Sequence, residues 1–129
     1  MRSEEVGVDR PGIVERSVAY SLRIINLYRE LEKDGVGRIL GNQLLRSGTS
    51  IGANVHEAQG GQSKADFIAK MSIAHKEARE SAYWLLLIRD ANLVSANRIG
   101  DLYEETEQLI KILSSILLTS KTGRKKDAK

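Results

Sequence analysis

The chain has 129 residues, which suits a single domain with its own core and is short for two domains. It contains no cysteine, which excludes disulfides, thiolate metal sites and cysteine nucleophiles and favours a cytoplasmic protein. The N-terminal segment lacks an apolar signal region, and the longest apolar run, residues 82–88, is too short to span a membrane. We therefore expect no membrane association, and the scarcity of proline and aromatic residues favours helix over sheet.

The net charge of +3 is concentrated at the C-terminal end. Residues 121–129 hold five basic residues and one acidic residue, whereas residues 1–120 hold 15 basic and 16 acidic residues. A solvated tail is one interpretation of this segment, and a basic arm that binds RNA or DNA is the other. Under the second interpretation, the expected nucleic-acid contacts are Arg16 and Arg23 on the first helix and Lys121, Arg124, Lys125 and Lys126 in the tail.

Two helices are expected in the first half of the chain. Pro11 suits the first turn of a helix, and the periodicity that follows predicts a helix to about residue 33. The glycines of residues 34–37 are typical of a turn. A second periodic stripe over residues 39–58 predicts another helix, closed by residues 60–61. The stripe expected to face the core on the first helix comprises Val14, Val18, Ser21, Ile25, Tyr28 and Leu31.

Two longer helices are expected in the second half. Ser63 followed by Asp66 resembles a capping box and predicts a helix that runs to about residue 93. The stripe expected to face the core on this helix comprises Phe67, Met71, Ala74, Ala78, Ser81, Leu85 and Ile88. Ser95 is placed to cap a fourth helix, which has a wide apolar face and ends near residue 120. Short connections make successive helices antiparallel. The sequence thus predicts an all-α, antiparallel up-down-up-down four-helix bundle over residues 11–120, with a disordered N-terminus at residues 1–10 and a basic disordered tail at residues 121–129.

Small residues follow one side of the second helix. Gly48 and Gly52 are four residues apart, so they lie one turn from each other on the same side. A glycine inside a helix costs about 1 kcal/mol relative to alanine, so some other contact should offset this cost. Close approach of a second helix provides such a contact, either inside the bundle or from another subunit.

Polar residues form a strip on the same helix. Ser50, Asn54 and Glu57 follow one another at spacings of four and three, close to the expected core seam. The geometry of a hairpin with its turn near residues 61–62 places Lys70 opposite this strip, as a counter-charge for Glu57 with Asn54 bridging. One interpretation is an internal polar network that fixes register. The alternative is a groove for a ligand or partner, lined by Arg46, Ser50, Asn54 and Glu57.

The stretch Leu45–Leu85 resembles the signature of the four-helix bundle proteins first noted as products of intervening sequences in bacterial 23S rRNA genes. The resemblance implies a cytoplasmic bundle that assembles into rings, typically homopentamers. The accessory proteins of diversity-generating retroelements, which bind nucleic acid and a reverse transcriptase, are similar. The elements that carry the resemblance are Ser50-Ile51, Ala53-Asn54, Glu57, Ser63, Phe67, Ile73-Ala74 and Glu77 or Glu80.

The chain departs from the family pattern after Glu57. Ala58 stands where the family often has glycine, and Gln59 and Gln62 stand where a basic residue often follows. Because this basic residue is absent, nucleic-acid binding is a weaker interpretation of this side of the second helix.

Motifs for catalysis or cofactor binding are not found, and we expect no catalytic residues, cofactor or metal. His56 and His75 fall about 12 Å apart along the axis of the expected hairpin, too far to share a metal ion. Three classes of function stay open. The first is a homo-oligomeric scaffold, with a pentamer favoured, that binds RNA or DNA. The second is a bundle that docks a protein partner on the fourth helix, and the third is an enzyme that uses the carboxylate strip of the second helix.

Overall fold

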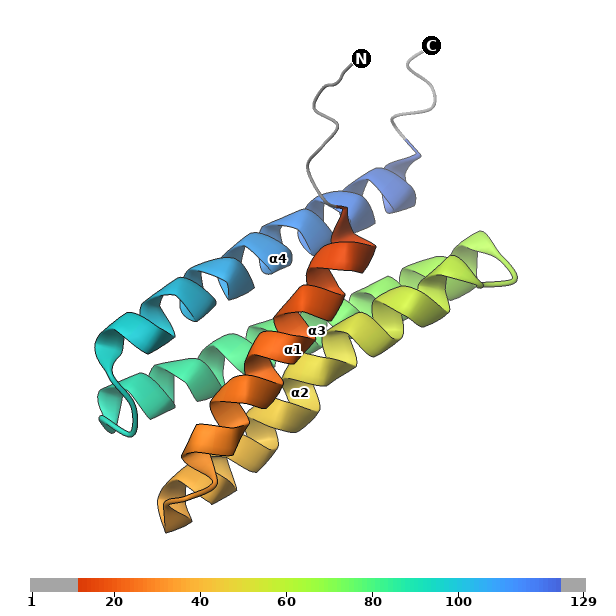
Figure 1. Ribbon diagram of the computed structural model, residues 1–129. Helices are drawn as coiled ribbons and strands as arrows, with labels where there is room; N and C mark the ends of the chain where they lie inside the picture. The colour runs from red at the N-terminus through yellow and green to blue at the C-terminus, as the bar shows by residue number, and fades with distance from the viewer. Residues whose placement is uncertain (1–11, 124–129) are drawn as a thin grey trace, which may run out of the picture.

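The computed structural model describes residues 12–123, which form four antiparallel helices. They are α1 (Ile13–Leu31), α2 (Gly35–Gln59), α3 (Lys64–Asp90) and α4 (Ala96–Thr122). Each helix packs against the next in the chain, and α4 returns to α1 (Figure 1). The predicted all-α four-helix bundle is confirmed. Pro11, the predicted N-terminal segment, and Arg124, Lys125 and Lys126 lie outside the described residues.

The turn between α1 and α2 is shorter than the glycines suggested. α1 ends at Leu31, and α2 already begins at Gly35. The carboxylate of Asp34 accepts a hydrogen bond from the amide of Gly37 at 2.9 Å and so caps the new helix. A Cβ at Gly37 would overlap the carbonyl oxygen of Leu31, so glycine permits this tight turn rather than ending a helix there.

At the other helix starts, Ser63 caps α3 through its side chain, whereas Ser95 precedes α4 without a side-chain capping hydrogen bond. The hydroxyl of Ser63 accepts a hydrogen bond from the amide of Asp66 at 3.1 Å, as the capping box predicted. α3 stops at Asp90, before the expected residue 93, and the chain then turns through Asn92 with a φ of 58°. α4 continues past the expected residue 120 to a left-handed Gly123, so Lys121 lies in its last turn.

The core agrees with the predicted stripes on α3 and α4 but not on α1. The fully buried side of α4 includes Leu102, Leu109 and Leu113, which pack in the core of the same chain. On α1 the predicted stripe is wrong by about one position, and Val18 is 44% exposed. α1 is apolar on two adjacent sides, so periodicity alone could not choose between them. The residues that α1 buries are Ser17, Tyr20, Ile24, Leu27 and Leu31.

The glycines of α2 face α1 of the same chain. A Cβ at Gly48 would lie 2.9 Å from Cγ1 of Ile24, and one at Gly52 would lie 3.3 Å from the carbonyl oxygen of Ser17. Both glycines are buried. Of the two alternatives, close approach inside the bundle is therefore the one observed, and these glycines are not a contact surface for another subunit.

Two buried hydroxyl pairs fix the relative positions of the helices. Tyr20 on α1 and Thr106 on α4 share a hydrogen bond of 2.6 Å, and Ser47 on α2 and Ser81 on α3 share one of 2.8 Å. All four residues are 0–1% exposed. Burial, the largest influence, raises the pKa of Tyr20 to about 12. These pairs are specific because a slip of either helix would leave a buried hydroxyl without its partner.

Candidate functional site

The polar strip of α2 lies along its junction with α3. Nζ of Lys70 lies 2.8 Å from Oε1 of Glu57, the pairing that the hairpin geometry suggested. The hydrogen bond to Glu57 and its negative charge raise the pKa of Lys70. Asn54 does not bridge this pair, because its amide donates to the carbonyl oxygen of Ser50 at 2.8 Å. Ser50 in turn donates to the carbonyl oxygen of Arg46.

Arg46 belongs to a second set of contacts across the same junction. Its guanidinium lies 2.5 Å from Oε2 of Glu80 and 3.6 Å from Oε1 of Glu77. The indole nitrogen of Trp84 donates to the same oxygen of Glu80 at 3.0 Å. Glu77 and Glu80 were named from the sequence, but Arg46 was missed as their partner. The antiparallel register that pairs Glu57 with Lys70 also places these carboxylates beside Arg46.

The strip is at the surface rather than buried. Glu57, Lys70 and Arg46 are all 40% or more exposed at their side chains. Ser50 and Asn54 satisfy carbonyl groups of their own helix, and the charged members pair across to α3. This arrangement ties α2 to α3 and favours the structural interpretation of the strip over a ligand groove.

We predict that Arg46→Leu destabilises the fold by about 1–2 kcal/mol. Glu77 is 8% exposed, and within the described residues its Oε1 accepts no hydrogen bond, so Arg46 is the cation that compensates its charge. The expected loss is below the figure for fully buried pairs because Arg46 is half exposed. Denaturant unfolding measures it. A double variant that combines Arg46→Leu with Glu77→Gln should regain most of the lost stability. A double variant less stable than Arg46→Leu alone would contradict the pairing.

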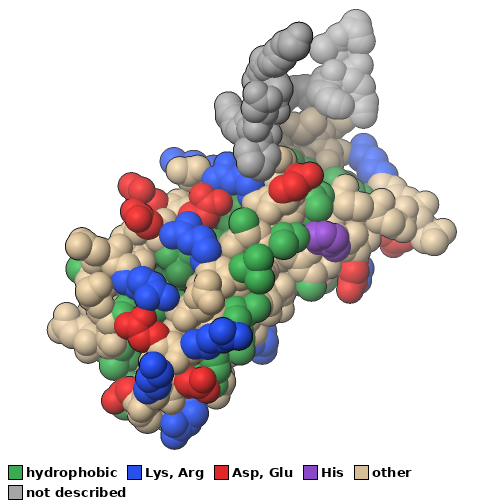
Figure 2. All heavy atoms as spheres, in the orientation of Figure 1, with side chains coloured by type: hydrophobic (Ala, Val, Ile, Leu, Met, Phe, Trp, Pro, Cys, Tyr) green, Lys and Arg blue, Asp and Glu red, His purple; other side chains and the backbone are tan. Residues whose placement is uncertain are grey.

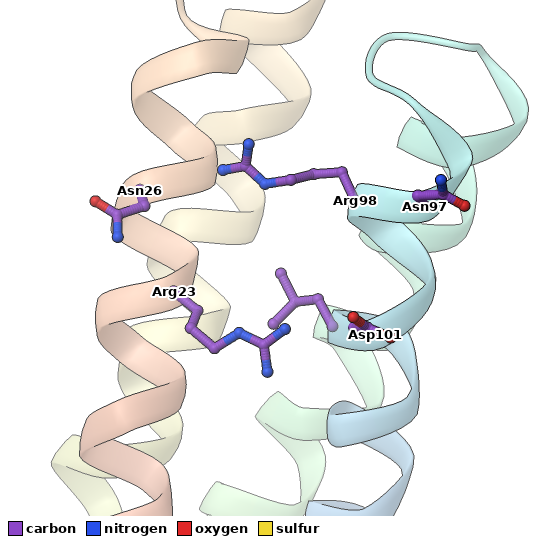
Figure 3. Close-up of a pocket in the computed structure, with 6 residues that line it drawn as sticks. Arg23, Asn26, Asn97, Arg98 and Asp101 are labelled. Carbon is purple, nitrogen blue, oxygen red and sulfur yellow. The ribbon is translucent and has the colours of Figure 1, made fainter.

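A hollow of about 260 Å³ lies between α1 and α4. Figure 3 shows Arg23 and Arg98 extending into this gap from opposite sides, whereas Asn26 and Asn97 point away from it. Arg98 pairs with Glu30 at 2.6 Å. The hollow therefore combines positive and negative side chains, and Asp101 also lines it.

Arg16 and Arg23 differ in availability, although the sequence placed them on one basic line. The guanidinium of Arg16 donates to Glu105 at 2.7 Å and 3.1 Å and to Gln108 at 2.8 Å. It joins α1 to α4 and is not free for nucleic acid. Arg23 is exposed and forms no ion pair with any of the described residues, so it is still a candidate contact.

The two histidines lie in different surroundings. Nδ1 of His56 lies 3.0 Å from the carbonyl oxygen of Gly52 in its own helix. His75 lines a groove between α3 and α4, where burial, followed by the charges of Arg79 and Lys121, lowers its pKa. Within residues 12–123, His, Asp and Glu side chains nowhere gather in threes that could hold a metal ion. None of the four described helices combines the length and hydropathy needed to cross a membrane.

Comparison with known proteins agrees with this arrangement of helices. Residues 12–115, which include α1, α2, α3, the polar strip and most of α4, match the model of a family described as 23S rRNA-intervening sequence protein. The chain belongs to this family. The name of the family refers to intervening sequences of 23S rRNA. A comparison with the curated proteins found no match to the chain.

A solved structure supports the same assignment. It is the crystal structure of a protein of unknown function from the S23 ribosomal protein family of Bacteroides thetaiotaomicron. The two sequences are 39% identical, the match covers 82% of this chain and 98% of the other, and the TM-score is 0.79. This chain and the solved neighbour thus share the four-helix fold described above.

Proposed function

We propose that this protein is a non-catalytic scaffold that assembles with copies of itself into a ring, with five subunits favoured, and offers clustered basic residues to RNA or DNA. The observation that carries the proposal is the exposure of large apolar side chains on two separate helix faces. Such side chains lose contact with water when a partner covers them, which favours association. Each of the two faces is described below.

The first apolar face lies on α1. Val18 and Leu22 are one turn apart, and Leu22 is 57% exposed. Ile25 continues the same side and is half-buried. Figure 2 shows hydrophobic side chains in a row over the junction of α1 and α2. This face, named the α1 face here, lies beside the helix contact that the glycines of α2 permit.

The second apolar face lies on the first turns of α2. Val36 and Ile39 are three residues apart, and Ile39 is 64% exposed. The contact between Ser47 and Ser81 places these turns beside the end of α3. This α2 face is on the flank of α2 toward α3, whereas α1 packs on the other flank. The α1 face and the α2 face are therefore different surfaces of one chain.

Two different faces favour a ring over a two-fold dimer. When one face of a subunit binds a different face of the next, the contacts repeat from subunit to subunit, and a rotation that closes gives a ring. In a five-membered ring the segments that begin at Lys121 would together bring about twenty positive charges, and such clustering strengthens salt-sensitive binding of a polyanion. The rest of each chain is nearly neutral, so binding of a polyanion depends on bringing several of these basic segments together.

We predict that Leu22→Glu and Ile39→Glu each convert the assembly to monomers with little change in the melting temperature. A buried carboxylate opposes the contact between subunits, whereas both positions are exposed within one chain. Light scattering in line with size exclusion measures the mass. Leu118→Glu is the matched control, because Leu118 is 56% exposed on α4 outside both faces.

Mixing the two variants tests whether the faces bind each other. The Ile39→Glu chain keeps an intact α1 face, and the Leu22→Glu chain keeps an intact α2 face. The mixture should therefore form a dimer, although neither variant associates alone. Two variants that stay assembled, or a mixture that stays monomeric, would count against the proposed ring contact.

A further inference from the structure

The groove between α3 and α4 gathers donor groups at the end of the bundle where α4 finishes. It encloses about 340 Å³ and is open to solvent. Ser72 and His75 line it from α3, and Ser114 and Lys121 line it from α4. Leu117 and Leu118 complete its wall. Two hydroxyls, an imidazole and an ammonium group thus converge on one concave surface, named the α3–α4 groove here.

The α3–α4 groove is electropositive. None of the described residues that line it is acidic. Arg79 lies one turn from His75 on α3, and its charge together with that of Lys121 lowers the pKa of His75, although burial has the larger effect. Nζ of Lys64 would lie 3.9 Å from a Cβ at Gly123, which places a further ammonium group at the end of α4.

Positive charge continues along α4 beyond the groove. Lys111 is one turn from Ser114 on α4, and Glu107, one turn further, is the nearest carboxylate on that side of the helix. Lys111 and Lys121 are ten residues apart, about 15 Å along α4. The row of basic residues is therefore longer than a single phosphate group.

We propose that the α3–α4 groove binds phosphate groups in the backbone of a nucleic acid, with His75 and Lys121 as the central contacts. The two serine hydroxyls and the ammonium groups are donors, and phosphate oxygens are acceptors. The length of the basic row favours a polyanion over a single phosphate ion. This inference rests on the proposed nucleic-acid role and names its surface, which shares Lys121 with the contacts predicted from the sequence but not Arg16 or Arg23.

Proton uptake accompanies binding in this proposal. His75 is neutral in the free protein near pH 7 because burial, Arg79 and Lys121 all lower its pKa. A phosphate beside it favours the imidazolium form, so the pKa of His75 is higher in the complex than in the free protein. Affinity therefore rises as the pH falls through the pKa of the complex, and it levels off below the pKa of the free protein.

The test measures binding of a fluorescent 20-nucleotide oligouridylate to the full chain by anisotropy, between pH 5.5 and 8 and over a range of salt concentrations. We expect Lys121→Gln to weaken binding by about 3-fold to 10-fold. It should also lower the slope of log affinity against log salt by about 0.7, which corresponds to one phosphate contact on a single strand. His75→Gln should remove the pH dependence, and His56→Gln is its matched control on α2.

Nuclear magnetic resonance of the histidine rings provides a readout that does not depend on tight binding. The pKa of His75 should rise when oligouridylate is added, whereas the ring signals of His56, which lies on α2 away from the groove, should not respond to the oligonucleotide. Inorganic triphosphate is added in a parallel titration. Triphosphate that binds as tightly as the oligonucleotide would overturn the assignment to a nucleic acid, because a free polyphosphate would then account for the chemistry of the groove.

The remaining outcomes separate the groove from the proposed function. Oligonucleotide that binds equally well to the wild type, His75→Gln and Lys121→Gln would overturn the groove and leave the nucleic-acid role to other basic residues. If no oligonucleotide binds, the nucleic-acid role fails. The triphosphate titration then decides whether the groove is a phosphate site. A raised pKa of His75 would then support a phosphate site, and an unchanged pKa would overturn it.

Discussion

Gly48→Leu is expected to destabilise the protein by about 3 kcal/mol and to lower its melting temperature by about 10 °C. A Cβ at this position would already lie 2.9 Å from Cγ1 of Ile24, which is itself fully buried. The rest of a leucine side chain has no space unless α1 moves away from α2. Thermal unfolding followed by circular dichroism measures the change.

Two further variants test whether the loss of stability comes from the close contact between α1 and α2. Gly52→Leu should cost less, because a Cβ there would meet the carbonyl oxygen of Ser17 at 3.3 Å, a less severe contact. Gly100→Ala on α4 is the control, since a Cβ there has no neighbour within 4 Å in the described part of the chain. It should stabilise the helix by about 0.5–1 kcal/mol. A Gly48→Leu variant as stable as the wild type would refute the close approach of α1 and α2.

Alkaline pH is expected to weaken the fold through Tyr20. The pKa of Tyr20 is about 12 in the folded protein, against 10.0 for an ordinary tyrosine. Between these values the unfolded chain releases the phenolic proton and the folded chain keeps it. The contribution of Tyr20 is therefore fully present below pH 10 and is lost as the pH rises toward 12. The loss amounts to about 2 kcal/mol over that range.

Tyr20→Phe isolates this effect from the titration of other groups. The variant should lose about 1–2 kcal/mol at pH 7, because it lacks the hydrogen bond to Thr106. Urea unfolding of both proteins at pH 7, 10 and 11 gives the comparison. The stability of the wild type should fall more steeply above pH 10 than that of Tyr20→Phe. Parallel curves would contradict a phenol that resists ionisation in the core.

The sequence predicts the helices well where one face is clearly apolar. On α3, Met71, Ala74 and Leu85 all lie in the core as their spacing indicated. The cap at Ser63 was also predictable, because a short side chain followed by an acidic residue satisfies a free amide at a helix start. Local chemistry and periodicity are sufficient for such features.

The α1 side of the bundle required information that local patterns do not contain. Whether Val14 and Val18 or Tyr20 and Ile24 face the core depends on which side of α1 the glycines of α2 contact. Gly37 similarly belongs to a helix because Asp34 caps it and the backbone of Leu31 passes close by. Long-range packing decides these cases.

The candidate sites divide in the same way. The pair of Glu57 and Lys70 followed from the register of one hairpin. The α3–α4 groove did not, because Ser72 and His75 meet Ser114 and Lys121 only after α4 packs along α3. Arg16 and Arg23 looked equivalent in the sequence, but only the structure shows that Glu105 and Gln108 occupy the first of them.

The mass of the wild-type protein in solution tests the central claim, self-assembly of a scaffold, most directly. Light scattering in line with size exclusion should be run at low and high salt. Apolar faces hold the proposed ring together, so the account predicts a mass about five times that of one chain at both salt concentrations. A protein that has the mass of a single chain under both conditions would contradict the account.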